Sequence, residues 1–150
     1  MRRRDFIRAA AAVTAVSLAT KNAFSAEPMT VYKDPNCGCC HAWTKAMQNA
    51  GYAVEIHDLD DLSEIKQKYG ISAELQGCHT AVMAGYFIEG HVPLESVNWL
   101  LTERPEIAGL AVPAMPSGSL GMGDDPSASY DVLAVDRAGK ATLHTAVRPT

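Results

Sequence analysis

The sequence predicts one α/β domain in which a mixed β-sheet is flanked by helices. Short runs rich in β-branched and aromatic residues alternate with segments whose apolar residues recur at helical spacing. This alternation is typical of parallel strands that are joined by crossover helices. The chain length of 150 residues, of which 47% are hydrophobic and 20% charged, also suits a single domain.

The first half of the predicted domain holds two pairs of a strand and a helix. Residues Met29 to Lys33 form a short strand, which Asp34-Pro35-Asn36 ends with loop-forming residues. The segment from His41 to Ala50 has apolar residues at helical spacing. A second strand, Tyr52 to His57, and a second amphipathic helix, Leu62 to Tyr69, follow in the same order.

The next elements predict a hairpin and a third helix. A strand from Thr80 to Ala84 is separated by Gly85 from the run Tyr86 to Gly90, which indicates antiparallel pairing. Apolar residues lie on one face of a helix from Leu94 to Glu103. The resulting order, β-α-β-α-β-β-α, resembles the thioredoxin fold over roughly residues 29–103, so we expect a thioredoxin-like mixed sheet.

A long loop and a terminal hairpin complete the predicted fold. The loop, Ala111 to Ser129, is rich in Pro, Gly and Ser and exceeds the usual length of a connection, so it is either functional or poorly ordered. It contains Met115 and Met122, whose thioethers are soft ligands for Cu(I), although loop methionines more often fill gaps. Residues Tyr130 to Asp136 and Lys140 to Val147 alternate apolar and polar side chains, which predicts a C-terminal β-hairpin.

The first 26 residues have the features of a secretory signal. A basic start precedes an apolar stretch from Ala9 to Ala19 and a group of small residues, so we expect cleavage after Ser25 or Ala26. The run Arg3-Arg4-Asp5-Phe6-Ile7-Arg8 resembles the twin-arginine export signal. This resemblance implies export to the periplasm, an oxidising compartment in which thiols tend to form disulfides. We expect no membrane span, because no apolar run reaches the necessary length.

The charge is distributed unevenly along the chain. The first 26 residues hold five of the 13 basic residues but one of the 17 acidic residues. The remaining 124 residues therefore carry a formal charge of −8, against −4 for the whole chain. A nucleic-acid partner or an anionic membrane surface is not expected, because both require a basic footprint.

Three of the four cysteines occupy four consecutive positions, Cys37-Gly38-Cys39-Cys40, between a predicted strand and a predicted helix. The pair Cys37 and Cys40 indicates thiol chemistry, because the N–H groups at a helix N-terminus stabilise a thiolate. A redox pair needs two thiols, and Cys39 between them would invite scrambling in an oxidising compartment. Three adjacent thiolates instead suit a soft ion such as Cu(I), which favours metal binding over thiol exchange.

The fourth cysteine, Cys78, is followed by His79 and Thr80. This segment resembles the thioredoxin stretch in which a cis-proline and a threonine face the C-x-x-C pair, with His79 at the approximate place of the proline. If the fold holds, Cys78 and His79 lie against the three clustered cysteines. They then add one thiolate and one imidazole to the predicted metal site.

Two other interpretations of the cysteines remain open. An exported protein can hold two structural disulfides, for example Cys37–Cys40 with Cys39–Cys78, although bridges within so short a loop stabilise little. Zinc takes the same types of ligand, but structural zinc sites usually use two well-separated pairs. We therefore expect copper before zinc.

The histidines differ in their expected roles. His41 lies on the solvent side of the predicted helix and is either an exposed helix residue or a ligand that swings over the cysteines. His91 follows the predicted hairpin and is either a turn residue or, if this turn folds towards Cys78, a ligand. We assign His57 and His144 to structural roles.

Four motifs occur in order along most of the chain. They are Tyr32-Lys33-Asp34-Pro35-Asn36-Cys37-Gly38-Cys39-Cys40, Gly77-Cys78-His79-Thr80-Ala81-Val82, Glu89-Gly90-His91-Val92-Pro93 and Pro113-Ala114-Met115-Pro116-Ser117-Gly118-Ser119-Leu120-Gly121-Met122. Together they resemble the CopG-like periplasmic copper-resistance family. The resemblance implies a thioredoxin-like domain that binds copper through clustered cysteines, with help from histidines, in bacterial copper homeostasis.

The resemblance also implies a ligand set. Its thiolates are Cys37, Cys39, Cys40 and Cys78, and its histidine candidates are His79, His41 and His91. Because each thiolate can bridge two ions, we expect a Cu(I)–thiolate cluster, with a single-copper site as the milder form, and a metal-binding protein rather than an enzyme. The alternative is a thiol-disulfide oxidoreductase acting on copper or copper proteins, in which Cys37 attacks and Cys40 or Cys39 resolves. Copper ions and other periplasmic copper-handling proteins are the expected partners.

Overall fold

The structure is a computed structural model that describes residues 27–149, so the expected signal segment and its cleavage position lie outside the described residues. The strands are β1 Met29–Lys33, β2 Val54–Asp58, β3 His79–Met83, β4 Tyr86–Glu89, β5 Gly109–Ala111, β6 Tyr130–Val135 and β7 Ala141–Val147. The helices are α1 Gly38–Asn49, α2 Ser63–Lys68 and α3 Leu94–Glu103, with one 3₁₀ turn, η1 Ala73–Leu75. Within residues 27–149, no helix combines the length and the apolar character needed to cross a bilayer.

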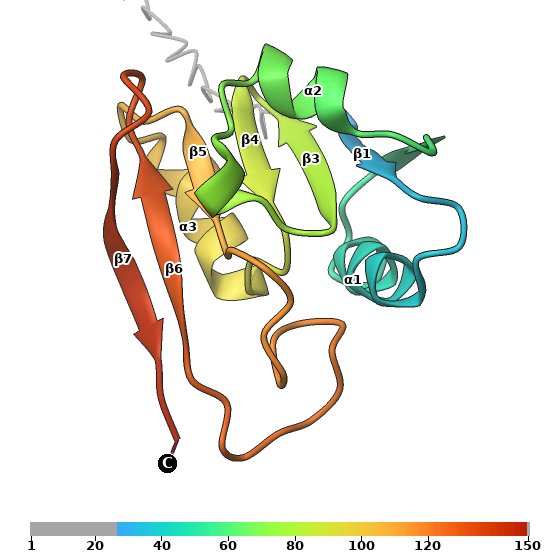
Figure 1. Cartoon of the computed structure of the whole chain (residues 1–150), viewed down its shortest axis with the longest axis vertical. Coiled ribbons are helices and arrows are strands. Elements are labelled where there is room, and N and C mark those ends of the chain that lie inside the picture. The colour runs from blue at the N-terminus through green and yellow to red at the C-terminus, as the bar shows by residue number, and fades with distance from the viewer. Residues whose placement is uncertain (1–26, 150) are drawn as a thin grey trace, which may run out of the picture.

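One mixed sheet contains all seven strands, in the order β2-β1-β3-β4-β5-β6-β7 (Figure 1). Strands β1 and β2 are parallel and are joined by α1, whereas β3 runs antiparallel to both β1 and β4. The hairpin between β3 and β4 turns at Ala84 and Gly85, which both have positive φ. This order and these directions confirm the predicted thioredoxin-like sheet.

The two faces of the sheet are covered by different helices. Helices α1 and α3 pack on one face, where Trp43 and Leu100 are fully buried, and Figure 1 shows α3 behind the strands. The segment of α2 and η1 covers the other face, where Leu75 packs against Phe87. Since side chains alternate along a strand, β3 directs His79 to the face of α1 and Thr80 to the face of α2.

The C-terminal part follows the prediction except for one added strand. Strands β6 and β7 form the predicted hairpin, with a register shift between Val132 and Leu133. Strand β5 overlaps the start of the predicted loop and was not expected, because three residues beginning with a glycine give no strand pattern. The loop after β5 passes below the sheet towards α1 (Figure 1), and Gly121 packs there against the Cys39 carbonyl oxygen and the Trp43 nitrogen.

Candidate metal centre

Cys37 caps the N-terminus of α1. Its backbone is extended, and its sulfur accepts a hydrogen bond from the Cys40 N–H at 3.3 Å. Helix α1 therefore begins at Gly38, three residues before the predicted start. The cap places Cys39 and Cys40 in the first turn of the helix, where N–H groups without helical partners favour negative charge.

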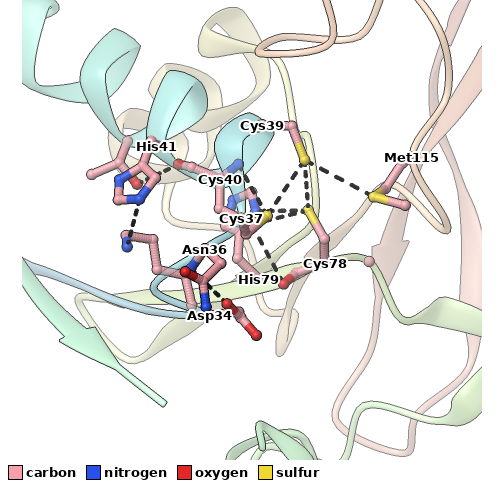
Figure 2. The surroundings of a disulfide bond; sticks show 12 residues. Asp34, Asn36, Cys37, Cys39, Cys40, His41, Cys78, His79 and Met115 are labelled. Atoms are coloured by element: carbon pink, nitrogen blue, oxygen red, sulfur yellow. Dashed lines mark hydrogen bonds between the residues drawn. A yellow bond between two sulfur atoms is a disulfide. The ribbon is translucent and has the colours of Figure 1, made fainter. Parts of the chain in front are cut away.

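The four cysteine sulfurs lie within 4.8 Å of one another (Figure 2). Cys37 and Cys40 form a disulfide, while Cys39 and Cys78 are free thiols. The Cys78 sulfur lies 3.3 Å from that of Cys40 and 3.6 Å from that of Cys39. The expectation that Cys78 faces the other cysteines is therefore met. Of the two disulfides considered above, the structure contains Cys37–Cys40 and not Cys39–Cys78.

One loop methionine lies beside the thiols. The Met115 sulfur is 4.0 Å from the Cys39 sulfur, and the Met115 side chain is 52% exposed. It approaches from the side opposite to the helix, as Figure 2 shows. Met122 takes part in a turn, in which its N–H donates to the Ser119 carbonyl at 2.8 Å.

His91 lies next to Cys78 in a fixed orientation. Its Nδ1 is 2.6 Å from the Leu120 carbonyl oxygen, which can only accept, so Nδ1 carries the proton. Burial lowers the pKa of His91, although the bond to Leu120 opposes that shift. The ring is therefore neutral at pH 7, and its unprotonated Nε2 lies 3.0 Å from the Cys78 sulfur. A metal ion at Cys78 would meet this lone pair directly.

His79 is completely buried beside the same thiol. Its Nδ1 lies 3.4 Å from the Cys78 sulfur, and its ring centroid lies 4.5 Å from that of Trp43 and 5.3 Å from that of His91. Burial lowers the pKa of His79 to about 3, so this imidazole is neutral at physiological pH. Cys78, His79 and His91 form a second set of ligand atoms within 4.8 Å. Cys78 belongs to both sets.

His41 is the predicted histidine that the structure does not bring to the sulfurs. Its Nε2 lies 3.0 Å from the Pro35 carbonyl oxygen and 3.5 Å from the Lys33 amine. Figure 2 shows the ring turned away from the cysteines. The remaining histidines lie elsewhere: His57 pairs with a neighbouring glutamate, and the His144 ring lies 4.1 Å from that of Trp99.

A buried ion pair close to Cys78, on the face of the sheet that α2 covers, was not predicted from the sequence. Lys66 of α2 and Glu89 of β4 pair in the interior, and the hydroxyl of Thr80 donates to Glu89 at 2.6 Å. The available signal was a glutamate that ends an otherwise apolar run, Tyr86-Phe87-Ile88-Glu89. A charged residue in such a strand is rarely buried without a partner.

The Cys78 thiol should react slowly with iodoacetamide in the disulfide form. Burial raises the pKa of Cys78 from 9.0 to about 12, and hydrogen bonding to Cys39 adds to the shift. At pH 8 the thiolate fraction is then about a thousandfold lower than in the denatured chain. Pulsed alkylation with mass spectrometry should show a Cys78 rate that rises about tenfold per pH unit from pH 7 to 9. A rate that levels off in this range would contradict the shift.

The chain is similar to proteins whose family or structure is known. Residues 75–122 match a family described as protein of unknown function, DUF411. A solved structure of copper resistance protein copG, form 1, is 38% identical, with 83% of this chain and 100% of that chain covered at a TM-score of 0.76. Form 2 is also 38% identical, with 81% and 99% covered at a TM-score of 0.75. The search of curated proteins gives no match. At this identity and coverage, the chain belongs to the CopG family of copper resistance proteins.

Proposed function

We propose that this protein binds copper as Cu(I) in the periplasm, in copper homeostasis. The observation that carries the proposal is the convergence of four cysteine sulfurs with two neutral imidazoles. Thiolates are soft ligands that select Cu(I), and neutral imidazole also binds copper. The proposed ligands are Cys37, Cys39, Cys40, Cys78, His79 and His91. His41 stays a candidate that would have to rotate away from Pro35 to reach the sulfurs.

The disulfide limits how much copper the protein can hold. Reduction of Cys37–Cys40 takes two electrons and two protons from two external thiols, which become a disulfide, and gives two further thiols on this chain. With four thiolates within 4.8 Å, each sulfur can bridge two ions, so we propose a thiolate-bridged Cu(I) cluster in the reduced protein. In the disulfide form, the thiolates that remain available are Cys39 and Cys78.

Anaerobic titration tests this proposal. The reduced protein, residues 27–150, should bind more than one Cu(I) ion per chain, counted by native mass spectrometry and elemental analysis. The disulfide form should bind fewer, because it has lost two thiolates. Zn(II) titrated in parallel should be displaced by Cu(I), since clustered thiolates prefer the softer ion. One copper ion or fewer per reduced chain would refute the cluster.

A thiol-disulfide oxidoreductase is the second candidate function. The Cys37–Cys40 disulfide at a helix N-terminus supports it, because Cys37 is partly exposed and Cys40 is fully buried. An accessible attacking thiol and a protected resolving thiol suit exchange with a substrate. With copper as substrate, the dithiol would reduce two Cu(II) ions to Cu(I), form the disulfide and release two protons.

Serine variants distinguish the two functions. Reduction of a disulfide substrate should survive Cys39→Ser and be lost in Cys37→Ser if the protein is an oxidoreductase, because Cys37 attacks and Cys40 resolves. Both variants should instead lose copper capacity if all four thiolates hold the metal. The measurement is substrate turnover alongside copper stoichiometry for each variant.

The proposed location depends on residues 1–26. We propose that this segment directs export by the twin-arginine route and is cleaved after Ser25 or Ala26, so that the mature chain starts at Ala26 or Glu27 and contains the domain of residues 27–150. Mass spectrometry of the periplasmic fraction would identify the new N-terminus. Replacing Arg3 and Arg4 by lysine should retain the precursor in the cytoplasm. Other periplasmic copper-handling proteins are the proposed partners for delivery and removal of the metal.

A further inference from the structure

A buried polar network joins the two chain segments that carry Cys78 and His91. Lys66 is 6% exposed and Glu89 is 0% exposed, and their side chains form an ion pair on the face of the sheet opposite to α1. Thr80 lies directly across from Glu89 in the antiparallel pair of β3 and β4, and its hydroxyl donates to Glu89 at 2.6 Å. The network therefore bridges α2, β3 and β4.

The same two charged side chains contact the backbone before Cys78 and a side chain after it. The Gly77 N–H donates to the Glu89 carboxylate at 2.8 Å, and the Lys66 amine donates to the Gly77 carbonyl at 3.2 Å. The Lys66 amine also donates to the Thr80 hydroxyl at 3.3 Å. Gly77 and Thr80, which flank Cys78 and His79, are thus both hydrogen-bonded to the same ion pair.

The segment that carries His91 is also held in place by contacts with the segment that carries Cys78. Glu89 lies two residues before His91, and the intervening Gly90 donates its N–H to the His79 carbonyl at 2.9 Å. Gly90 and Gly77 pack so closely that a Cβ at Gly77 would lie 2.5 Å from the Gly90 Cα. The relative position of the two ligand-bearing segments therefore depends on these contacts of Gly90 together with the hydrogen bond from Gly77 to Glu89.

A buried ion pair is weak evidence of a gain in stability. Desolvation of two charges is expensive, and apolar residues of similar volume often replace a buried pair without loss of stability. Orientation of metal ligands by the groups behind them is a separate effect, whose loss typically weakens metal binding by about 10- to 100-fold.

We propose that Lys66 and Glu89 are positioning residues of the copper site, which hold Cys78 and His91 at the spacing that lets both reach one metal ion. This inference rests on the proposed copper binding. Neither residue belongs to the two candidate ligand sets of the described residues, and both act through the backbone of Gly77 and the hydroxyl of Thr80.

A pair of substitutions separates positioning from stability. Lys66→Met alone leaves Glu89 buried and unpaired, so this variant should lose both stability and copper affinity. The double variant Lys66→Met/Glu89→Met leaves no unpaired charge, so its stability to urea should recover towards that of the wild type. Its affinity for Cu(I) should still fall by about 10- to 100-fold, because Gly77 and Thr80 have lost their partners.

The measurements are Cu(I) affinity by competition with a chromophoric chelator, X-ray absorption of the loaded protein, and amide hydrogen exchange of the metal-free protein. The double variant should show fewer sulfur and nitrogen neighbours per copper and faster exchange at the Gly77 amide. Val135→Ala is the control, because it removes buried apolar volume on the same face of the sheet and should lower stability without changing affinity. Wild-type affinity in the double variant would overturn the inference, whereas a wild-type protein that binds no Cu(I) would overturn the proposed function itself.

Discussion

Replacement of Cys78 by serine should weaken Cu(I) binding more than any other single substitution at the site. Cys78 is the residue that the four-sulfur set and the set with two histidines have in common. Its loss therefore removes a thiolate and also separates His91 from the remaining sulfurs. We expect the affinity to fall by at least about 100-fold, the upper end of what loss of a supporting group alone costs. Competition with a chromophoric Cu(I) chelator, under anaerobic and reducing conditions, gives the value.

Two histidine variants provide the comparison for Cys78→Ser. His91→Gln removes an imidazole whose Nε2 lies 3.0 Å from the Cys78 sulfur, so it should cause an intermediate loss. His41→Gln should leave the affinity unchanged, because that ring bonds to the Pro35 carbonyl instead. Unchanged affinity in Cys78→Ser would show that the three clustered cysteines hold the copper alone. A loss in His41→Gln equal to that in His91→Gln would show that His41 rotates onto the metal.

Replacement of Gly90 by alanine should lower the free energy of unfolding by about 2–5 kcal/mol, because two penalties add. The backbone at Gly90 has φ +69°, which costs an L-residue about 1–2 kcal/mol. An added Cβ would also collide with the Val112 carbonyl oxygen and lie 3.3 Å from the Gly77 Cα. Such overpacking costs about 1–3 kcal/mol. Urea denaturation of the metal-free protein measures the sum.

Gly70→Ala is the matched control for Gly90→Ala. Gly70 has φ +67°, close to that of Gly90, but a Cβ there would meet no atom within 4 Å. In this control, the free energy of unfolding should therefore fall only by the cost of the backbone conformation, about 1–2 kcal/mol. Equal losses in the two variants would show that the chain near Gly90 moves aside at no cost. In that case the contact between Gly90 and Gly77 would not hold the two segments together.

The sequence was most informative where a local pattern decides the structure. The predicted helix from Leu94 to Glu103 has those bounds in the structure, because its apolar residues repeat at helical spacing and Pro105 follows. The placement of Cys78 against the other cysteines was also predictable, since the order of strands and helices determines which strand lies beside β1. Both results depend on regular elements rather than on loops.

The details that escaped prediction depend on contacts between distant parts of the chain. The role of His91 was open because its orientation depends on the Leu120 carbonyl, 29 residues later in a loop. Helix α1 starts before the predicted residue because the Cys37 sulfur caps it. Sequence patterns do not indicate this cap, because the residues preferred at the N-cap position have side-chain oxygens. The pairing of Lys66 with Glu89 could not be read from either residue alone, because it requires the sheet to bring α2 over β4.

The separation of the proposed ligands along the chain would link copper binding to the folding equilibrium. Cys37, Cys39 and Cys40 are neighbours in sequence, so an unfolded chain keeps them together, whereas Cys78 and His91 join them only in the folded state. If copper binds to both the folded and the unfolded chain, the free energy of unfolding at saturating copper rises only by the ratio of the two copper affinities. Each factor of ten in that ratio adds about 1.4 kcal/mol. As the copper concentration rises, the gain in the free energy of unfolding should approach a plateau. The height of this plateau measures how much Cys78 and the histidines add to the copper affinity of the three clustered cysteines. The copper-loaded protein should accordingly resist proteolysis better than the metal-free protein.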